Sequence, residues 1–202
     1  MSGKKMKWLL GSLALLTLPV GAIACGDTEE TASSQPTTRQ AAATTSPAAL
    51  PSTNIYDAIA ANLPGIVQQH MEAGTDPNRD PVPKGFPFEG AYPLHIAVIT
   101  GNKEIVQILL DHGADLNLES ANKDQSTPLS WAAVFLQTDM IPIIVQSGAL
   151  INHVDANNAT PLDAAVFSRM MNLTDKDIVK QADKTIVLLK DLRGRLASEL
   201  QK

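Results

Sequence analysis

The sequence of 202 residues contains a single cysteine, Cys25. A lone thiol has no partner for an intramolecular disulfide, so the fold has to be held together by burial of apolar side chains. An unpaired cysteine also needs its own explanation in a chain that is exported.

Motifs of enzymatic catalysis are missing. The chain has no GxSxG, no HExxH and no phosphate-cradling glycine loop. His70, His112 and His153 recur at intervals of 42 and 41 residues, which indicates repetition in the chain. Metal ligands would instead have to converge within about 2 Å of one ion. We therefore predict a protein that is not an enzyme and that needs no cofactor or metal.

Basic residues are outnumbered, with 16 Lys and Arg against 21 Asp and Glu. Three of the lysines lie within residues 1–24, so a chain without that segment has 13 basic and 21 acidic residues, a net charge of −8. Nucleic acids and anionic lipid headgroups both require a basic footprint on the protein. The composition therefore disfavours a nucleic-acid-binding function.

Residues 1–24 have the pattern of a secretory signal peptide. Three lysines precede an apolar run from Trp8 to Val20, and Ala22-Ile23-Ala24 forms a small-residue cleavage site. The run is too short to predict a membrane-spanning helix. Ala-Ile-Ala-Cys resembles the lipobox of bacterial lipoproteins, which implies that Cys25 is acylated. The alternative is ordinary cleavage after Ala24, which would release a soluble protein with a free thiol.

Gly26 follows the cysteine, and resemblance to enteric lipoproteins then implies a lipid anchor in the outer membrane, with the protein facing the periplasm. Residues 25–53 are rich in Thr, Ser, Ala, Pro and Gln. Such a composition buries too little apolar surface to offset the entropy of ordering the chain. We predict a disordered tether over 25–53, with a reach on the order of 30 Å, before a folded domain over 54–202.

A Pro-Leu pair occurs three times in this domain, beginning at residues 93, 128 and 161, with spacings of 35 and 33 residues. Gly-Ala follows the first two prolines by 20 residues. Self-similarity at this period predicts a stack of repeated supersecondary units. The proline suits the first turn of a helix, and the glycine suits a left-handed residue that ends one.

These units resemble ankyrin repeats, because residues 92–97 (YPLHIA) and 113–117 (GADLN) match the TPLHxA and GADxN segments of that family. The resemblance implies an all-α ankyrin-repeat solenoid of about four helix-turn-helix units, at about 54–90, 91–125, 126–158 and 159–202. It also implies that His95 bonds to turn backbone. Pro142 is compatible with its unit only in the first turn of a helix.

The last unit departs from the period. Gly194 is the nearest closing glycine, and it follows Pro161 by 33 residues where the other units take 20. Apolar residues at helical spacing from Ile178 to Leu196 predict one extended capping helix from Asp175 to about Glu199.

An enlarged loop between Asn78 and Tyr92 is the first candidate binding surface. Loops on a rigid scaffold carry function, and aromatic side chains are typical interface anchors. The alternative is that the phenylalanines fold back and seal the first unit. The candidate partner-binding residues of this loop are Phe86, Phe88, Glu89 and Tyr92.

The second candidate surface is an apolar stripe along the concave face, where partners of ankyrin repeats usually lie. Its residues are Ile99, Val134, Phe135 and Phe167, and the alternative is that some of them belong to the core. Residues 85–160 contain eight acidic residues and two lysines, with Glu119 and Asp124 near the turn tips. This charge would steer a partner with a basic patch, unless it is only a solvated acidic surface.

Exported bacterial ankyrin proteins that resemble this chain include immunity proteins. This resemblance implies an inhibitor that occludes a toxic, lipase-like effector such as a phospholipase in the periplasm. A periplasmic scaffold or stress-protection factor, similar to exported ankyrin proteins linked to catalase, is the alternative function.

Overall fold

The computed structural model describes residues 51–201, which belong to one compact unit from Thr44 to Lys202. The signal peptide, Cys25 and most of the tether lie outside the described residues. Within 51–201 the secondary structure is helical and contains no strand, so the all-α fold class is confirmed. The helices are α1 (Ile55–Ala60), α2 (Pro64–Glu72), α3 (Pro93–Thr100), α4 (Lys103–Asp111), α5 (Pro128–Val134), α6 (Ile141–Gln146), α7 (Pro161–Met171), α8 (Lys176–Asp191) and α9 (Ala197–Leu200).

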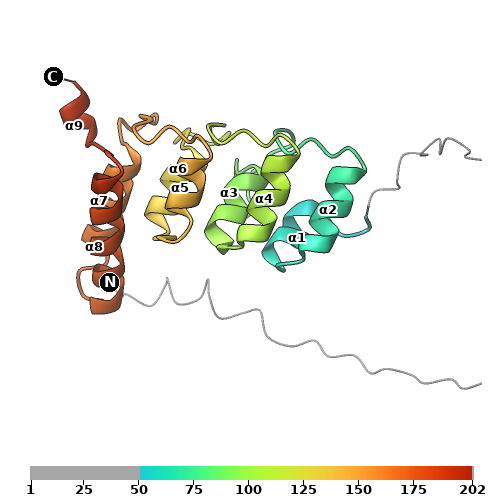
Figure 1. Cartoon of the computed structure of the whole chain (residues 1–202), viewed down its shortest axis with the longest axis horizontal. Coiled ribbons are helices and arrows are strands. Elements are labelled where there is room, and N and C mark those ends of the chain that lie inside the picture. The colour runs from blue at the N-terminus through green and yellow to red at the C-terminus, as the bar shows by residue number, and fades with distance from the viewer. Residues whose placement is uncertain (1–50, 202) are drawn as a thin grey trace, which may run out of the picture. The chain divides into compact units, whose positions relative to one another are not determined.

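The first eight helices form four pairs that follow one another in chain order (Figure 1). The first helices of the pairs form one layer, in which α1 packs on α3, α3 on α5, and α5 on α7. The second helices cover this layer from one side. No helix within residues 51–201 is both long enough and apolar enough to cross a bilayer.

Local sequence explains where the inner helices start. Helices α3, α5 and α7 each begin at a proline, whose missing N–H would be unpaired in the first turn. The side chains of Thr127 and Thr160 accept hydrogen bonds from the N–H groups of Ser130 and Asp163, which caps α5 and α7. Pro142 lies in the first turn of α6, as its chemistry requires.

His95 joins the second unit to the third. Its Nδ1 accepts from the N–H of Tyr92 at 3.3 Å, and its Nε2 lies 3.0 Å from the carbonyl oxygen of Ser126, to which it donates. Burial lowers the pKa of His95 to about 4, so the ring is neutral at physiological pH. The prediction that this histidine bonds to turn backbone is confirmed.

Asparagine side chains hold successive units in register. In each case the Oδ1 atom accepts a hydrogen bond from a backbone N–H in the turn that closes the next unit. The pairs are Asn78 with Asp115 (2.8 Å), Asn117 with Leu150 (2.8 Å), and Asn152 with Arg195 (2.7 Å). The third pair shows that the last unit closes in the same register as the others, although its two helices are longer.

The prediction of one extended capping helix from Asp175 to about Glu199 is wrong. Helix α8 ends at Asp191, and the short helix α9 begins only at Ala197. Arg193 between them adopts a left-handed conformation with φ +69°. A turn therefore separates the two helices, in the place where the earlier units close.

Gly194 is required by this turn. Its N–H donates to the carbonyl oxygen of Leu189 at 2.7 Å, and a Cβ atom on it would lie 2.8 Å from the same oxygen. The apolar period nevertheless continues through the turn, because Leu192 and Leu196 still pack against the core. Periodicity alone therefore could not reveal the break.

The left-handed Arg193 yields a stability prediction. A non-glycine residue in this conformation costs roughly 1–2 kcal/mol, so Arg193→Gly should stabilise the protein by about 0.5–1 kcal/mol after the extra chain entropy of glycine is subtracted. Urea unfolding measures the change. Arg195→Gly is the matched control, because Arg195 does not have a positive φ, and it should give no gain. Equal effects of the two substitutions would contradict the assignment of the turn.

Candidate functional site

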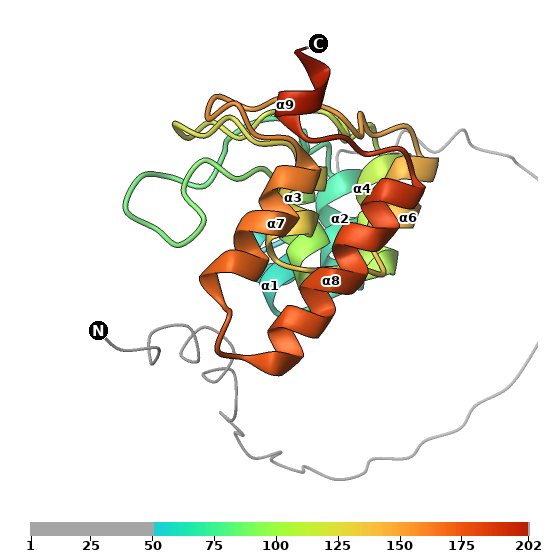
Figure 2. The same ribbon diagram turned by 90° about the vertical axis from the view of Figure 1, so that its left-hand side faces the viewer.

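The enlarged loop 79–92 is closed on itself by backbone hydrogen bonds. The N–H of Val82 donates to the carbonyl oxygen of Ala91, and the N–H of Gly90 donates to that of Val82, both at 2.8 Å. At the base of the loop the hydroxyl of Tyr56 donates to the carbonyl oxygen of Asp80 at 2.8 Å. Burial raises the pKa of Tyr56, which keeps this donor protonated. The loop, which lies between α2 and α3, extends beyond the other turns (Figure 2).

The same loop is attached to the turn 117–127 of the next unit. The N–H of Ala121 donates to the carbonyl oxygen of Gly90 at 2.8 Å, and Nδ2 of Asn122 lies 3.4 Å from the carbonyl oxygen of Glu89. Gly90 has φ +79°, and a Cβ atom on it would lie 2.4 Å from the backbone nitrogen of Asn122. Only glycine permits this approach of the two backbones.

The attachment brings three aromatic rings together, which we call the aromatic cluster: Phe88, Trp131 and Phe135. The ring of Phe88 lies 6.0 Å from that of Trp131 and 5.9 Å from that of Phe135. Phe88 therefore folds back, as the alternative interpretation of the loop required. It packs on the third unit, however, and not on the first. Phe86 remains 64% exposed.

The predicted apolar stripe is not continuous. Ile99 is half-buried and packs against the core, and its carbonyl oxygen accepts from Nε2 of Gln137 at 2.6 Å. Val134 is also half-buried. Phe135 and Phe167 are 45% and 57% exposed. Two of the four residues therefore present apolar surface to solvent, and one of these belongs to the aromatic cluster.

The acidic candidates all accept hydrogen bonds from within the chain. Oε2 of Glu89 accepts from the N–H of Gly85 at 3.1 Å. Glu119 lies 2.9 Å from Nε2 of His153, and Oδ1 of Asp124 accepts from Nδ2 of Asn157 at 3.0 Å. These carboxylates stabilise the turns while leaving negative charge near the surface. Tyr92 has no such role, and its ring lies 6.0 Å from that of His95.

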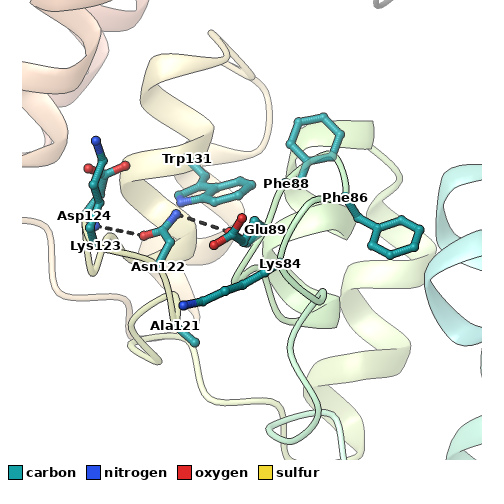
Figure 3. Close-up of a pocket in the computed structure, with 9 residues that line it drawn as sticks. All are labelled: Lys84, Phe86, Phe88, Glu89, Ala121, Asn122, Lys123, Asp124 and Trp131. Carbon is teal, nitrogen blue, oxygen red and sulfur yellow. Dashed lines mark hydrogen bonds between the residues drawn. The ribbon is translucent and has the colours of Figure 1, made fainter.

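A hollow of about 550 Å³ opens between loop 79–92 and the turn 117–127 (Figure 3). Its lining residues are Lys84, Phe86, Phe88, Glu89, Ala121, Asn122, Lys123, Asp124 and Trp131. The sequence did not identify Lys84, Lys123, Asn122 or Trp131 as site residues. The available signal was Trp131, a large indole within the Pro-Leu segment of a helix that otherwise carries small residues.

Other features of the surface are less informative. A group of exposed apolar residues lies at the end of α7 and in the following turn, where Met170, Met171 and Leu173 are exposed. In the described part of the chain, no group of three or more His, Cys, Asp or Glu residues is placed to hold a metal ion.

A family model described as ankyrin repeats (3 copies) matches residues 55–155, half of the chain. The chain is 33% identical over 115 residues to Alpha-latrocrustotoxin-Lt1a of Latrodectus tredecimguttatus, covering 56% of this chain and 8% of the toxin. It is 33% identical over 102 residues to the ARF GTPase-activating protein Git of Drosophila melanogaster, covering 50% of this chain and 14% of that protein.

A third relative is the BTB/POZ domain and ankyrin repeat-containing protein NBCL of Lupinus angustifolius, 31% identical over 118 residues. That match covers 58% of this chain and 23% of the lupin protein. The chain thus spans less than a quarter of the length of each of these three relatives.

The contact at Gly90 predicts a large effect of a single methyl group. Gly90→Ala adds the strain of a positive φ, roughly 1–2 kcal/mol, to a collision with backbone that cannot move aside. Gly85→Ala is the matched control, because Gly85 has a similar φ of +85° but nothing within 4 Å of its added Cβ. We expect urea unfolding to show a greater loss of stability for Gly90→Ala. Equal losses would contradict the close approach of the two backbones.

Proposed function

The chain belongs to the ankyrin-repeat family, and on this premise we propose that it binds another protein through loop 79–92 and the aromatic cluster beside it. Ankyrin repeats form a protein-interaction module that is generally non-enzymatic. The relatives are named as a toxin, a GTPase-activating protein and a BTB/POZ protein. Since each shares only a repeat segment with this chain, none of those names identifies its partner.

The observation that carries the proposal is the fixed position of the loop over the inner helices. Loop 79–92 is held at its base by Tyr56 and along its edge by Ala121. A surface that is ordered before binding loses less conformational entropy when a partner docks. Phe86 and Phe135 stand exposed on either side of the buried Phe88, and exposed aromatic rings beside a packed cluster are typical binding anchors.

In its finer form, the proposal is an immunity protein that is lipid-anchored through Cys25 to the outer membrane and faces the periplasm. It would inhibit a toxic envelope-targeting effector, such as a phospholipase, by covering its catalytic entrance. The signal-peptide pattern of residues 1–24 and the lone cysteine after it support this location. A rigid binding surface without a catalytic motif fits inhibition by occlusion.

Charge supports the choice of partner. Eight acidic residues against two lysines over 85–160 give this part of the surface a negative potential. Association with a partner that carries a basic patch would therefore be accelerated, most strongly at low ionic strength.

Capture of the product of the adjacent gene tests the proposal. If that gene encodes a lipase-like effector, the full chain should bind it, and cells that carry the chain should survive its expression in the periplasm. Phe86→Ala combined with Phe135→Ala should weaken binding at least about tenfold, because truncating an anchor costs more than 1 kcal/mol. Leu150→Ala, at an apolar residue that is also exposed, is the matched control.

Failure of the chain to bind the effector, or unchanged affinity of the double variant, would contradict the proposal. Capture of a catalase instead would support the alternative role as a stress-protection factor.

A further inference from the structure

Trp131 has a hydrogen-bond donor without an acceptor at the hollow. The residue is only 8% exposed, yet its indole N–H makes no hydrogen bond to any residue in the range 51–201. Figure 3 shows the nitrogen edge of the ring turned toward the side of the hollow that Asn122 and Asp124 line. Because buried indole N–H groups usually find a partner, this donor points to an acceptor supplied by a bound molecule.

Two cations border the same hollow without an ionic partner. Lys84 lies on loop 79–92, Lys123 lies on the turn 117–127, and both are exposed. The ion pairs found among the described residues join other side chains: Arg79 with Asp76, His153 with Glu119, and Arg169 with Asp183. Both ammonium groups are therefore available to a ligand.

The acceptors around the hollow are largely engaged. Glu89 accepts from Gly85, Asp124 accepts from Asn157, and Oδ1 of Asn122 accepts from the N–H of Asp124 at 3.0 Å. The unused hydrogen-bonding capacity of the hollow thus consists mainly of donors. A cationic side chain would have to share the carboxylates, and it would leave the Trp131 N–H unpaired. A carboxylate satisfies all three free donors.

We propose that the hollow receives an aspartate or glutamate side chain of the protein partner, held by the Trp131 indole N–H and the ammonium groups of Lys84 and Lys123. This inference rests on the proposed function and names the chemistry that the partner presents to the same surface. The rings of Phe86 and Phe88 line the hollow beside these donors, so the residue next to the acidic one in the partner is apolar. Lys84 and Lys123 balance the charges of Glu89 and Asp124, and the carboxylate enters without net repulsion.

The chain provides its own probe for this inference. It has two tryptophans, Trp8 and Trp131, so the full chain with Trp8→Phe and ¹⁵N-labelled tryptophan gives a single indole N–H resonance. Heptapeptides selected from a random phage-displayed library against this protein are the ligands. We expect the selected peptides to carry Asp or Glu beside an apolar residue, and to move the indole resonance downfield as the new hydrogen bond forms.

Substitutions on both sides identify the contacts. Changing the acidic residue of a selected peptide to Asn or Gln should weaken binding at least about tenfold, the range of a lost charge-assisted hydrogen bond. Lys84→Met combined with Lys123→Met, which keeps the aliphatic stems, should cause a similar loss. Lys103→Met combined with Lys190→Met, at two exposed lysines outside the hollow, is the matched control and should change nothing.

The inference is overturned by selection of basic peptides, by selection of none, or by an indole resonance that does not move. Its failure is distinguishable from failure of the proposed function. If acidic peptides bind but the effector does not, the hollow is assigned correctly and the proposed function is wrong. If the effector binds equally well to the variant with both Lys84→Met and Lys123→Met, the proposed function stands and the carboxylate subsite is wrong.

Discussion

Register between successive units is the constraint on which the rest of this structure depends. No unit can bury its apolar face alone, so each must pack on the next in one alignment. Asparagine side chains fix this alignment by accepting a backbone N–H from the following unit. Between the second and third units, His95 adds a further link to the carbonyl oxygen of Ser126.

The candidate site follows from this register because the enlarged loop has to meet the neighbouring turn at Gly90. The carbonyl oxygen of Gly90 accepts from Ala121, and the absence of a side chain allows the two backbones to touch. This contact carries Phe88 over the third unit and onto Trp131 and Phe135. The hollow with its unpaired donors lies where the loop and the turn 117–127 meet. An irregularity of the repeat thus becomes a shaped surface because the regular part is rigid.

Much of the fold was predictable because its signals are local. The prolines at the starts of α3, α5 and α7 and the backbone contacts of His95 depend on a few neighbouring residues. The end of α8 was not predictable, because Leu192 and Leu196 continue the apolar period through a turn that a left-handed Arg193 makes. Helical periodicity records which side chains are buried, and burial continues on both sides of that break.

The candidate site was predictable only in its general place. An enlarged loop with two phenylalanines marked the region, but whether Phe86 or Phe88 folds back depends on a contact with Ala121, about thirty residues along the chain. Trp131 escaped notice because a tryptophan in a helix reads equally well as core. Its unpaired N–H is a property of three-dimensional packing, and no spacing of residues reveals it.

The central claim is that loop 79–92 is ordered before any partner binds, and amide hydrogen exchange of the free protein tests it most directly. The N–H groups of Val82 and Gly90 close the loop, and that of Ala121 attaches it to the next unit. The account predicts that these three amides are protected nearly as well as those within α3. Exchange of all three at the rate of an unstructured chain would contradict it.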